Sequence, residues 1–401
     1  MTIYLTTALK SYVSSYQGLP SLAWQGIIIC FIESTLIGIC YFLSLYFVNE
    51  LHIDIAKAGI LMSFYGIGTV IGGLIGGKLS DRISPITVSI IGLLIQSFAY
   101  LILTQLQSFY LLSLNLLIIG MGSYSFITAN YVWVLAYCHR GENERLKALN
   151  ILGVASNLGL GLSAMIISLF TTHHFTSLFL FSGSVLLLTA CYLMVIRKNS
   201  INPSKSTLVS QKDQSTSLFP RKKTIAWLAL LCLFLMGIII SQTNSNYSLY
   251  LQEIFPEMGI KSFSILFTIN TLMVVFLQAP VVDLFSTSNK VLMIGIGAFL
   301  LGFGMAMLVF SYTFPIAILA CVVMTLGEII FFAYSQLICY EEGDEGKKGH
   351  SLGTYRMVYA GSRIAGPLLG GFIYQTLGGN MLWYLCGVFG LICLMGAISL
   401  V

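Results

Sequence analysis

The stretch AGILMSFYGIGTVIGGLIGGKLSDR, residues 58–82, decides the fold of this chain. Its first twenty residues contain no charged side chain, and the run then ends in Lys78, Asp81 and Arg82. About 20 predominantly apolar residues are what an α-helix needs to cross the hydrocarbon core of a bilayer. The stretch therefore predicts a membrane-spanning helix that ends in a short charged segment.

The composition of the whole chain extends this prediction. Hydrophobic residues make up 57% of the 401 residues and charged residues only 9%, whereas soluble domains carry about 25% charged residues. So few charges cannot form a surface in water, and lipid is the solvent for most of the chain. The composition excludes a soluble enzyme, a nucleic-acid-binding protein and a disordered chain.

Apolar runs of similar length recur along the sequence, separated by short polar turns. Helices are favoured in each because a helix satisfies its own backbone hydrogen bonds in lipid. We predict an all-α membrane protein with twelve spans at residues 21–48, 58–77, 86–104, 109–137, 147–171, 175–196, 224–251, 262–282, 290–310, 314–338, 351–376 and 380–400.

The basic residues predict the orientation of these spans. Of the 20 lysines and arginines, 16 fall in segments predicted to lie on the same side of the membrane as the N-terminus. Only Lys57 and Lys261 fall in loops on the opposite side, and Arg356 and Arg363 lie inside a span. Basic residues concentrate in cytoplasmic loops. We therefore expect both termini in the cytoplasm and a multi-pass protein of the cytoplasmic membrane.

A Ser-, Lys- and Asn-rich stretch divides the spans six and six. It predicts an N-terminal bundle at residues 1–198, a cytoplasmic linker at 199–222 and a C-terminal bundle at 223–401. The halves also resemble each other: Ala23, Asp81 and Gly120 have counterparts 203, 202 and 207 residues later, at Ala226, Asp283 and Gly327. Two similar bundles with a binding site between them are typical of secondary transporters.

Residues 73–82, GLIGGKLSDR, resemble the loop 2–3 signature of the major facilitator superfamily, and the likeness covers essentially the whole chain. The chain departs from the signature at Ser84-Pro85, where a glycine and a second basic pair are expected. The resemblance implies two pseudo-symmetric six-helix bundles and a conformational latch that stabilises the outward-facing state, here at Gly77, Asp81, Arg82 and Asp283. The alternative for these residues is a capped, solvated turn.

Within the superfamily, the chain is most similar to drug–proton antiporters and related proton-coupled carriers. Residues 325–328 (TLGE) and 31–33 (FIE) look like their acidic positions in helices ten and one. The chain departs from both groups at one position each. Ser34 stands where proton-coupled peptide carriers have an arginine, and Leu116 stands where drug antiporters have one. The Gly-Pro-Gly-Gly signature of antiporters is also missing from helix five, and a similar string lies at residues 366–371.

Four charged residues, Glu33, Glu328, Arg356 and Arg363, fall inside predicted spans. An ionisable side chain at that depth costs roughly 2.5–3.5 kcal/mol, so such residues face the bundle interior and are functional candidates. A carboxyl group that alternates between buried and water-facing environments can load and release a proton. We therefore predict proton-coupling roles for Glu33 and Glu328; for Glu33 the alternative is a structural hydrogen bond.

Glu328 and Arg363 lie at similar depths, about 18 and 20 Å above the cytoplasmic ends of consecutive antiparallel spans. They form either a fixed ion pair or a working site in which Arg363 binds an anionic substrate and Glu328 exchanges a proton. Arg356 shares a helix face with Arg363. It is a second candidate for the substrate site, or it snorkels to the inner interface.

Span seven carries a dense uncharged polar run at residues 241–248. The resemblance implies that helices one, four, seven and ten line the cavity. A small-molecule pocket combines apolar walls with a few orienting polar groups, and inter-helix hydrogen bonding is the alternative. The substrate-binding candidates from these spans are Asn130, Tyr131, Trp133, Gln242, Asn244, Asn246 and Tyr247.

These observations predict a monomeric, proton-coupled secondary transporter of a small organic solute, working by alternating access, with export preferred. The main alternative is a carrier for an organic anion or a peptide-like zwitterion that uses Arg363. A non-transporting membrane receptor is a remote alternative. No metal-ligand spacing and no nucleophile–base pair stands out in the sequence, so we expect no metal, no cofactor, no nucleic-acid partner and no enzyme.

Overall fold

The computed structural model describes residues 19–138, 142–169, 175–199, 223–285, 287–341 and 348–400. Regular secondary structure in these ranges is helical throughout, as predicted. The helices are α2 (Ser21–Ile37), η1 (Gly38–Phe42), α3 (Leu43–Leu45), η2 (Tyr46–Glu50), α4 (Ile55–Arg82), α5 (Pro85–Leu103), α6 (Phe109–Ala136), α7 (Glu142–Leu169), α8 (Phe175–Asn199), α9 (Lys223–Ser241), η3 (Gln242–Asn244), α10 (Tyr247–Ile254), α11 (Ile260–Leu284), α12 (Lys290–Met307), η4 (Leu308–Phe310), α13 (Phe314–Glu341), α14 (Lys348–Leu377) and α15 (Gly379–Ile398).

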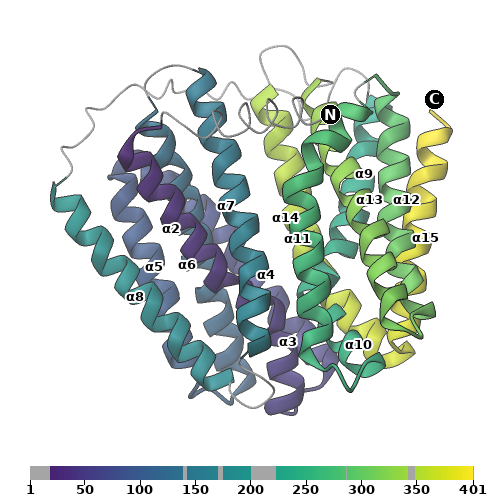
Figure 1. The fold of residues 1–401 in the computed structure, drawn as a ribbon, viewed down its shortest axis with the longest axis horizontal. Helices are drawn as coiled ribbons and strands as arrows, with labels where there is room; N and C mark the ends of the chain where they lie inside the picture. The colour runs from purple at the N-terminus through teal and green to yellow at the C-terminus, as the bar shows by residue number, and fades with distance from the viewer. Residues whose placement is uncertain are drawn as a thin grey trace, which may run out of the picture.

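Eleven helical segments of the described chain are long and apolar enough to cross a membrane. The remaining predicted span, residues 351–376, corresponds to α14, which has 30 residues and lies among the others but carries Arg356 and Arg363 and is less apolar. Helix α2 begins and α15 ends at the same end of the molecule (Figure 1). That arrangement agrees with an even number of crossings; the cytoplasmic placement of that end stays a prediction.

Span seven is broken, where the sequence predicted one continuous helix. Helix α9 ends at Ser241, a short 3-10 turn follows, and α10 starts at Tyr247. Ser241 and Thr243 donate their hydroxyls to the carbonyls of Ile238 and Ile240. Such side chains compete for backbone groups that a regular helix would use, so the polar run interrupts the helix. Broken helices of this kind form the binding sites of many transporters.

The helices form two groups, α2–α8 and α9–α15, which approach each other where α3 and α10 lie and diverge toward the other end (Figure 1). Close packing inside the two groups repeats. A Cβ on Gly92 would meet the Gly122 carbonyl oxygen at 2.7 Å, and one on Gly297 would meet that of Gly327 at 3.1 Å. The α12–α13 contact repeats the α5–α6 contact, because Gly297 lies 205 residues after Gly92 and Gly327 lies 205 residues after Gly122. The structure thus supports an internal repeat.

The repeat corrects one pairing inferred from the sequence. Gly120 packs against α4, where an added Cβ would meet the carbonyl oxygen of Tyr65 at 2.4 Å, whereas Gly327 packs against α12. The counterpart of Gly327 is therefore Gly122. The sequence could not separate the two glycines because they lie two residues apart on one helix and face different neighbours.

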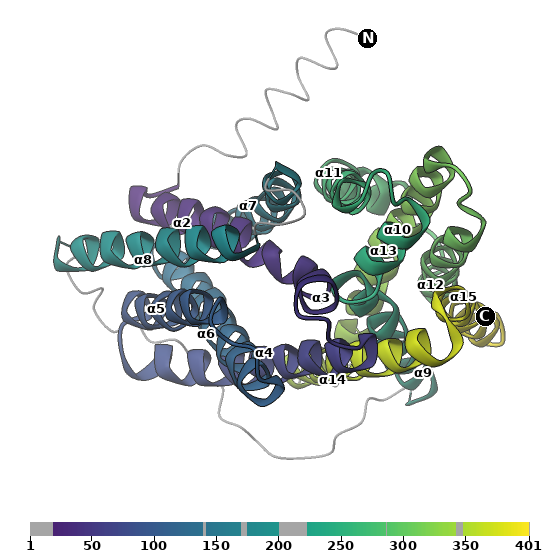
Figure 2. The ribbon, with the colours of Figure 1, turned by 90° about the horizontal axis from the view of Figure 1, so that it is seen from below.

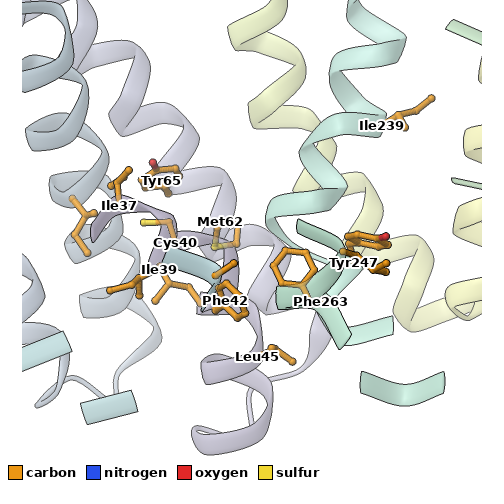
Figure 3. Close-up of a cluster of buried hydrophobic side chains, with 14 of the residues drawn as sticks. Ile37, Ile39, Cys40, Phe42, Leu45, Met62, Tyr65, Ile239, Tyr247 and Phe263 are labelled. Carbon is orange, nitrogen blue, oxygen red and sulfur yellow. The ribbon is translucent and has the colours of Figure 1, made fainter. Parts of the chain in front are cut away.

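The halves are joined through α4 with α14 and α7 with α11 (Figure 2). Near α3 and α10, the Asn49 amide donates to Gln252 Oε1 at 2.8 Å. Ser63 donates to the carbonyl oxygen of Ile364 at 2.8 Å. Phe42 meets Phe263 edge to face, with ring centroids 4.8 Å apart (Figure 3). Polar and aromatic contacts together therefore close this end of the interface.

The predicted latch region differs from the expectation of a turn. Helix α4 continues through Arg82, so Gly77 and Asp81 are helical and the chain turns only at Ser84. Asp81, Arg82 and Asp283 are exposed. Their side chains form no hydrogen bond or salt bridge with another described residue. The latch role stays a prediction, and so does the linker, because residues 200–222 lie outside the described ranges.

Candidate functional site

A cavity of about 140 Å³ lies between the two halves, at the middle of the helices. Its wall combines apolar side chains with hydroxyls, amides and two charged groups. The lining residues are Tyr41, Asn157, Leu160, Ile240, Thr243, Asn244, Tyr247, Leu266, Phe267, Asn270, Thr271, Val274, Cys321, Met324, Glu328, Tyr359 and Arg363. They come from η1, α7, α9, η3, α10, α11, α13 and α14, and none comes from α6, the predicted fourth span. An apolar wall with a few polar groups is the usual composition of a small-molecule site.

Glu328 is the acidic side of this cavity. Its Oε2 accepts a hydrogen bond from Asn270 Nδ2 at 3.0 Å, and the same amide donates to Thr325 Oγ1 at 2.9 Å. Helix α13 thus presents Glu328 to the cavity, and α11 holds it through a neutral amide. The carboxyl group has no basic partner within 4.0 Å among the described residues.

Arg363 is the basic side of the same cavity. Its Nη1 donates to the hydroxyl of Tyr124 at 2.7 Å, from α14 of one half to α6 of the other. Among the described residues, the guanidinium has no carboxylate within 4.0 Å. Arg363 and Glu328 therefore share one cavity without forming an ion pair in this structure, and no described carboxylate serves as a counter-ion for Arg363.

Glu33 lies away from the cavity, inside the N-terminal half. Its side chain is 0% exposed, and Oε1 accepts a hydrogen bond from Ser123 at 3.0 Å. Gln96, also fully buried, lies beside Glu33. A buried carboxylate without a cation is expensive, whereas the neutral acid is tolerated. The surroundings of Glu33 therefore favour its protonated, neutral carboxyl group.

The polar residues of span seven separate into two groups. Asn244 and Tyr247 line the cavity. Gln242 and Asn246 do not: the Gln242 amide donates to the Gly366 carbonyl at 2.9 Å, and Asn246 donates to Gln242 Oε1 at 2.7 Å. These two amides tie the broken helix to α14.

The candidates from span four also lie outside the cavity. Asn130 is fully buried and donates to the carbonyl of Gly26 at 3.1 Å, which joins α6 to α2. Trp133 is packed in the core, and Tyr131 is partly buried. Arg356 is exposed and lies near Tyr131. Of the nine predicted substrate-binding residues, the cavity brings together Arg363, Asn244 and Tyr247.

Sequence reasoning missed several residues of the site. Asn157 of α7 and Asn270 of α11 line the cavity, and Tyr124 binds Arg363. Asn270 is an amide in the middle of an apolar span, and that isolated polar residue was a signal that could have identified it. Nothing in the sequence distinguishes Tyr124 from the other tyrosines.

The comparisons with known proteins agree with this architecture. The family model described as Major Facilitator Superfamily matches residues 24–367, and the chain belongs to this superfamily. Its members are transporters and not enzymes. The chain is 25% identical over 340 residues to the uncharacterized MFS-type transporter YttB of Bacillus subtilis (strain 168), a match that covers 84% of this chain and 83% of the relative. It is 20% identical to YhjO of the same organism over 98% of this chain and 94% of that one.

Two solved structures share the fold. The nucleoside transporter NupG superposes with a TM-score of 0.77 at 16% identity, covering 95% of this chain and 99% of the other. A POT family transporter in complex with 5-aminolevulinic acid gives a TM-score of 0.77 at 14% identity, covering 96% of both chains. At this identity the likeness shows the fold alone.

Proposed function

We propose that this protein is a proton-coupled, alternating-access carrier of a small organic solute with an acidic group. The observation that carries the proposal is Arg363, a cation in a membrane-embedded cavity with no carboxylate within 4.0 Å among the described residues. Intramembrane charges are normally paired. A solute that brings its own carboxylate or phosphate supplies the missing counter-charge, and guanidinium binds both groups in a bidentate manner.

The rest of the cavity supports a small, partly polar solute. Asn157, Thr243 and Asn244 offer hydrogen bonds, and Glu328 can meet an amino group on the same molecule. A zwitterion of amino-acid size would satisfy both charges. The structural neighbour that binds 5-aminolevulinic acid carries such a molecule in a similar fold. The volume of about 140 Å³ also favours a small solute over a bulky one.

Glu33 is the proposed proton site. Its complete burial favours the neutral acid in this conformation. A rearrangement that admits water to Glu33 would allow the proton to leave. Because Glu33 does not line the cavity, proton and solute would occupy separate places in the carrier.

A lipophilic solute is the second candidate. Leu160, Phe267 and Met324 give the cavity an apolar face, and Glu328 could pair with a cationic group there. This alternative corresponds to the export that the resemblance to drug–proton antiporters favours.

Proteoliposomes with an internal pH dye separate these candidates. Wild type would be challenged with small organic acids, dipeptides, nucleosides and lipophilic cations, beside Arg363→Gln and its control Arg356→Gln. The control removes the same charge from the same helix at an exposed position outside the cavity. We expect proton flux with acids or zwitterions that is lost in Arg363→Gln and kept in Arg356→Gln. Flux with lipophilic cations that survives Arg363→Gln would refute the acidic solute.

A further inference from the structure

The hydrogen bond between Arg363 and Tyr124 connects the two halves at the cavity. Arg363 lies on α14 and Tyr124 on α6, and their side chains meet at 2.7 Å. A neutral phenol is a weaker partner for a guanidinium than a carboxylate, because a carboxylate adds the attraction of opposite charges and can accept two parallel N–H···O bonds. Tyr124 therefore occupies a position on Arg363 that an anion would take more favourably.

The position of Tyr124 is fixed by its surroundings in the N-terminal half. The preceding residue, Ser123, donates to Glu33. Gly120 and Gly122 bring α6 against the backbones of α4 and α5, where an added Cβ would lie within 3.0 Å of backbone atoms. Helix α6 thus moves only together with its neighbours, so a bond to Tyr124 is a bond to the whole N-terminal half.

We propose that Tyr124 is a positioning residue that holds Arg363 to the N-terminal half when the cavity is empty, and that an acidic group of the solute displaces it. This proposal rests on the proposed function of Arg363 as the solute's anion partner. Solute binding then removes one bond between the halves. A solute in the cavity would therefore make it easier for the halves to separate at the end where α3 and α10 meet.

Tyr124→Phe tests the first part without any solute. Spin labels at Lys57→Cys and Glu257→Cys report the separation of the halves near α3 and α10, because both residues are exposed and belong to different halves. The background would be Cys191→Ser, since Cys191 is exposed and the other eight cysteines are buried. The matched control is Tyr100→Phe, which removes a buried hydroxyl bonded to Cys40 within one half.

We expect Tyr124→Phe to shift the distance distribution of the purified protein toward longer distances, and Tyr100→Phe to leave it unchanged. Equal distributions in wild type and Tyr124→Phe would overturn the proposal. A shift of the same size in Tyr100→Phe would do so too, because it would assign the effect to general loosening.

The second part is tested with acetate, lactate, succinate and alanine as probes, with chloride as control. At least one acid should shift the wild-type distribution of spin-label distances in the direction seen for Tyr124→Phe. The apparent KM for transport of that acid should fall by about fivefold or more in Tyr124→Phe, because the competing hydroxyl is gone. An unchanged KM for a transported acid would overturn displacement. Transport of an acid that persists in Arg363→Gln would instead refute the proposed function, so the two failures are distinguishable.

Discussion

The amide of Asn49 in the N-terminal half donates to the amide oxygen of Gln252 in the C-terminal half at 2.8 Å. The two residues lie 203 positions apart in the sequence, one in η2 and the other in α10. They mark the end at which the halves are in contact, next to Phe42 and Phe263.

Linking these two positions should stop transport. We expect Asn49→Cys/Gln252→Cys, treated with a short bifunctional methanethiosulfonate, to lose nearly all solute flux, because the halves can no longer separate there. A reducing agent should restore the flux. Each single cysteine variant treated in the same way is the control. Undiminished flux in the linked protein would show that this end does not separate during transport.

Glu33→Gln should separate coupling from solute binding. The amide keeps the hydrogen bond to Ser123 but carries no proton to release, and Glu33 does not line the cavity. We expect proton-driven accumulation to disappear while solute counterflow, which needs no net proton movement, stays within about twofold of wild type, since no cavity hydrogen bond is lost. Intact pH-driven transport in vesicles would rule out the proton role.

Asn244→Ala and Asn246→Ala should have different effects although the two residues lie two positions apart. Asn244 lines the cavity, so its loss should raise the apparent KM by roughly two- to tenfold, the effect of one hydrogen bond. Asn246 binds Gln242, which holds α14, so its loss should lower thermal stability with little change in KM. An unchanged KM in Asn244→Ala would remove it from the site.

Gly327→Ala should destabilise the C-terminal half. The added Cβ would lie 2.2 Å from the Leu301 backbone nitrogen, and the two helices must move apart. Overpacking of this kind costs about 1–3 kcal/mol, which a lower thermal unfolding midpoint would report. Gly361→Ala is the control, because its Cβ would meet nothing within 4 Å. Equal midpoints for the two variants would contradict the close packing.

The sequence predicted most of the fold because the signal for a membrane helix is local. The apolar run at residues 58–77 and the charges after it identify α4 without any knowledge of its neighbours. The same locality identified Glu328 and Arg363, since a charge inside such a run is conspicuous by itself. The end of α4 was predicted less well, because the apolar run stops at residue 77 while the backbone stays helical through Arg82.

The parts of the site that were missed depend on which face of a helix meets the cavity. Asn244 and Asn246 belong to one polar run, yet Asn244 lines the cavity and Asn246 binds Gln242. Asn130 and Tyr124 lie on the same helix, but one binds the α2 backbone and the other reaches the opposite half. Such distinctions arise from the contact between the halves.

The glycine packing that repeats at a separation of 205 residues has a consequence for how the halves have diverged. The same separation places Glu328 at the position equivalent to Ser123, the residue that binds Glu33. The two halves thus share a packing scaffold and differ in their charged groups: the N-terminal half holds the buried carboxyl group of Glu33, and the C-terminal half presents Glu328 and Arg363 to the cavity. A chimera built from two N-terminal halves would retain the packing contact and lack Arg363.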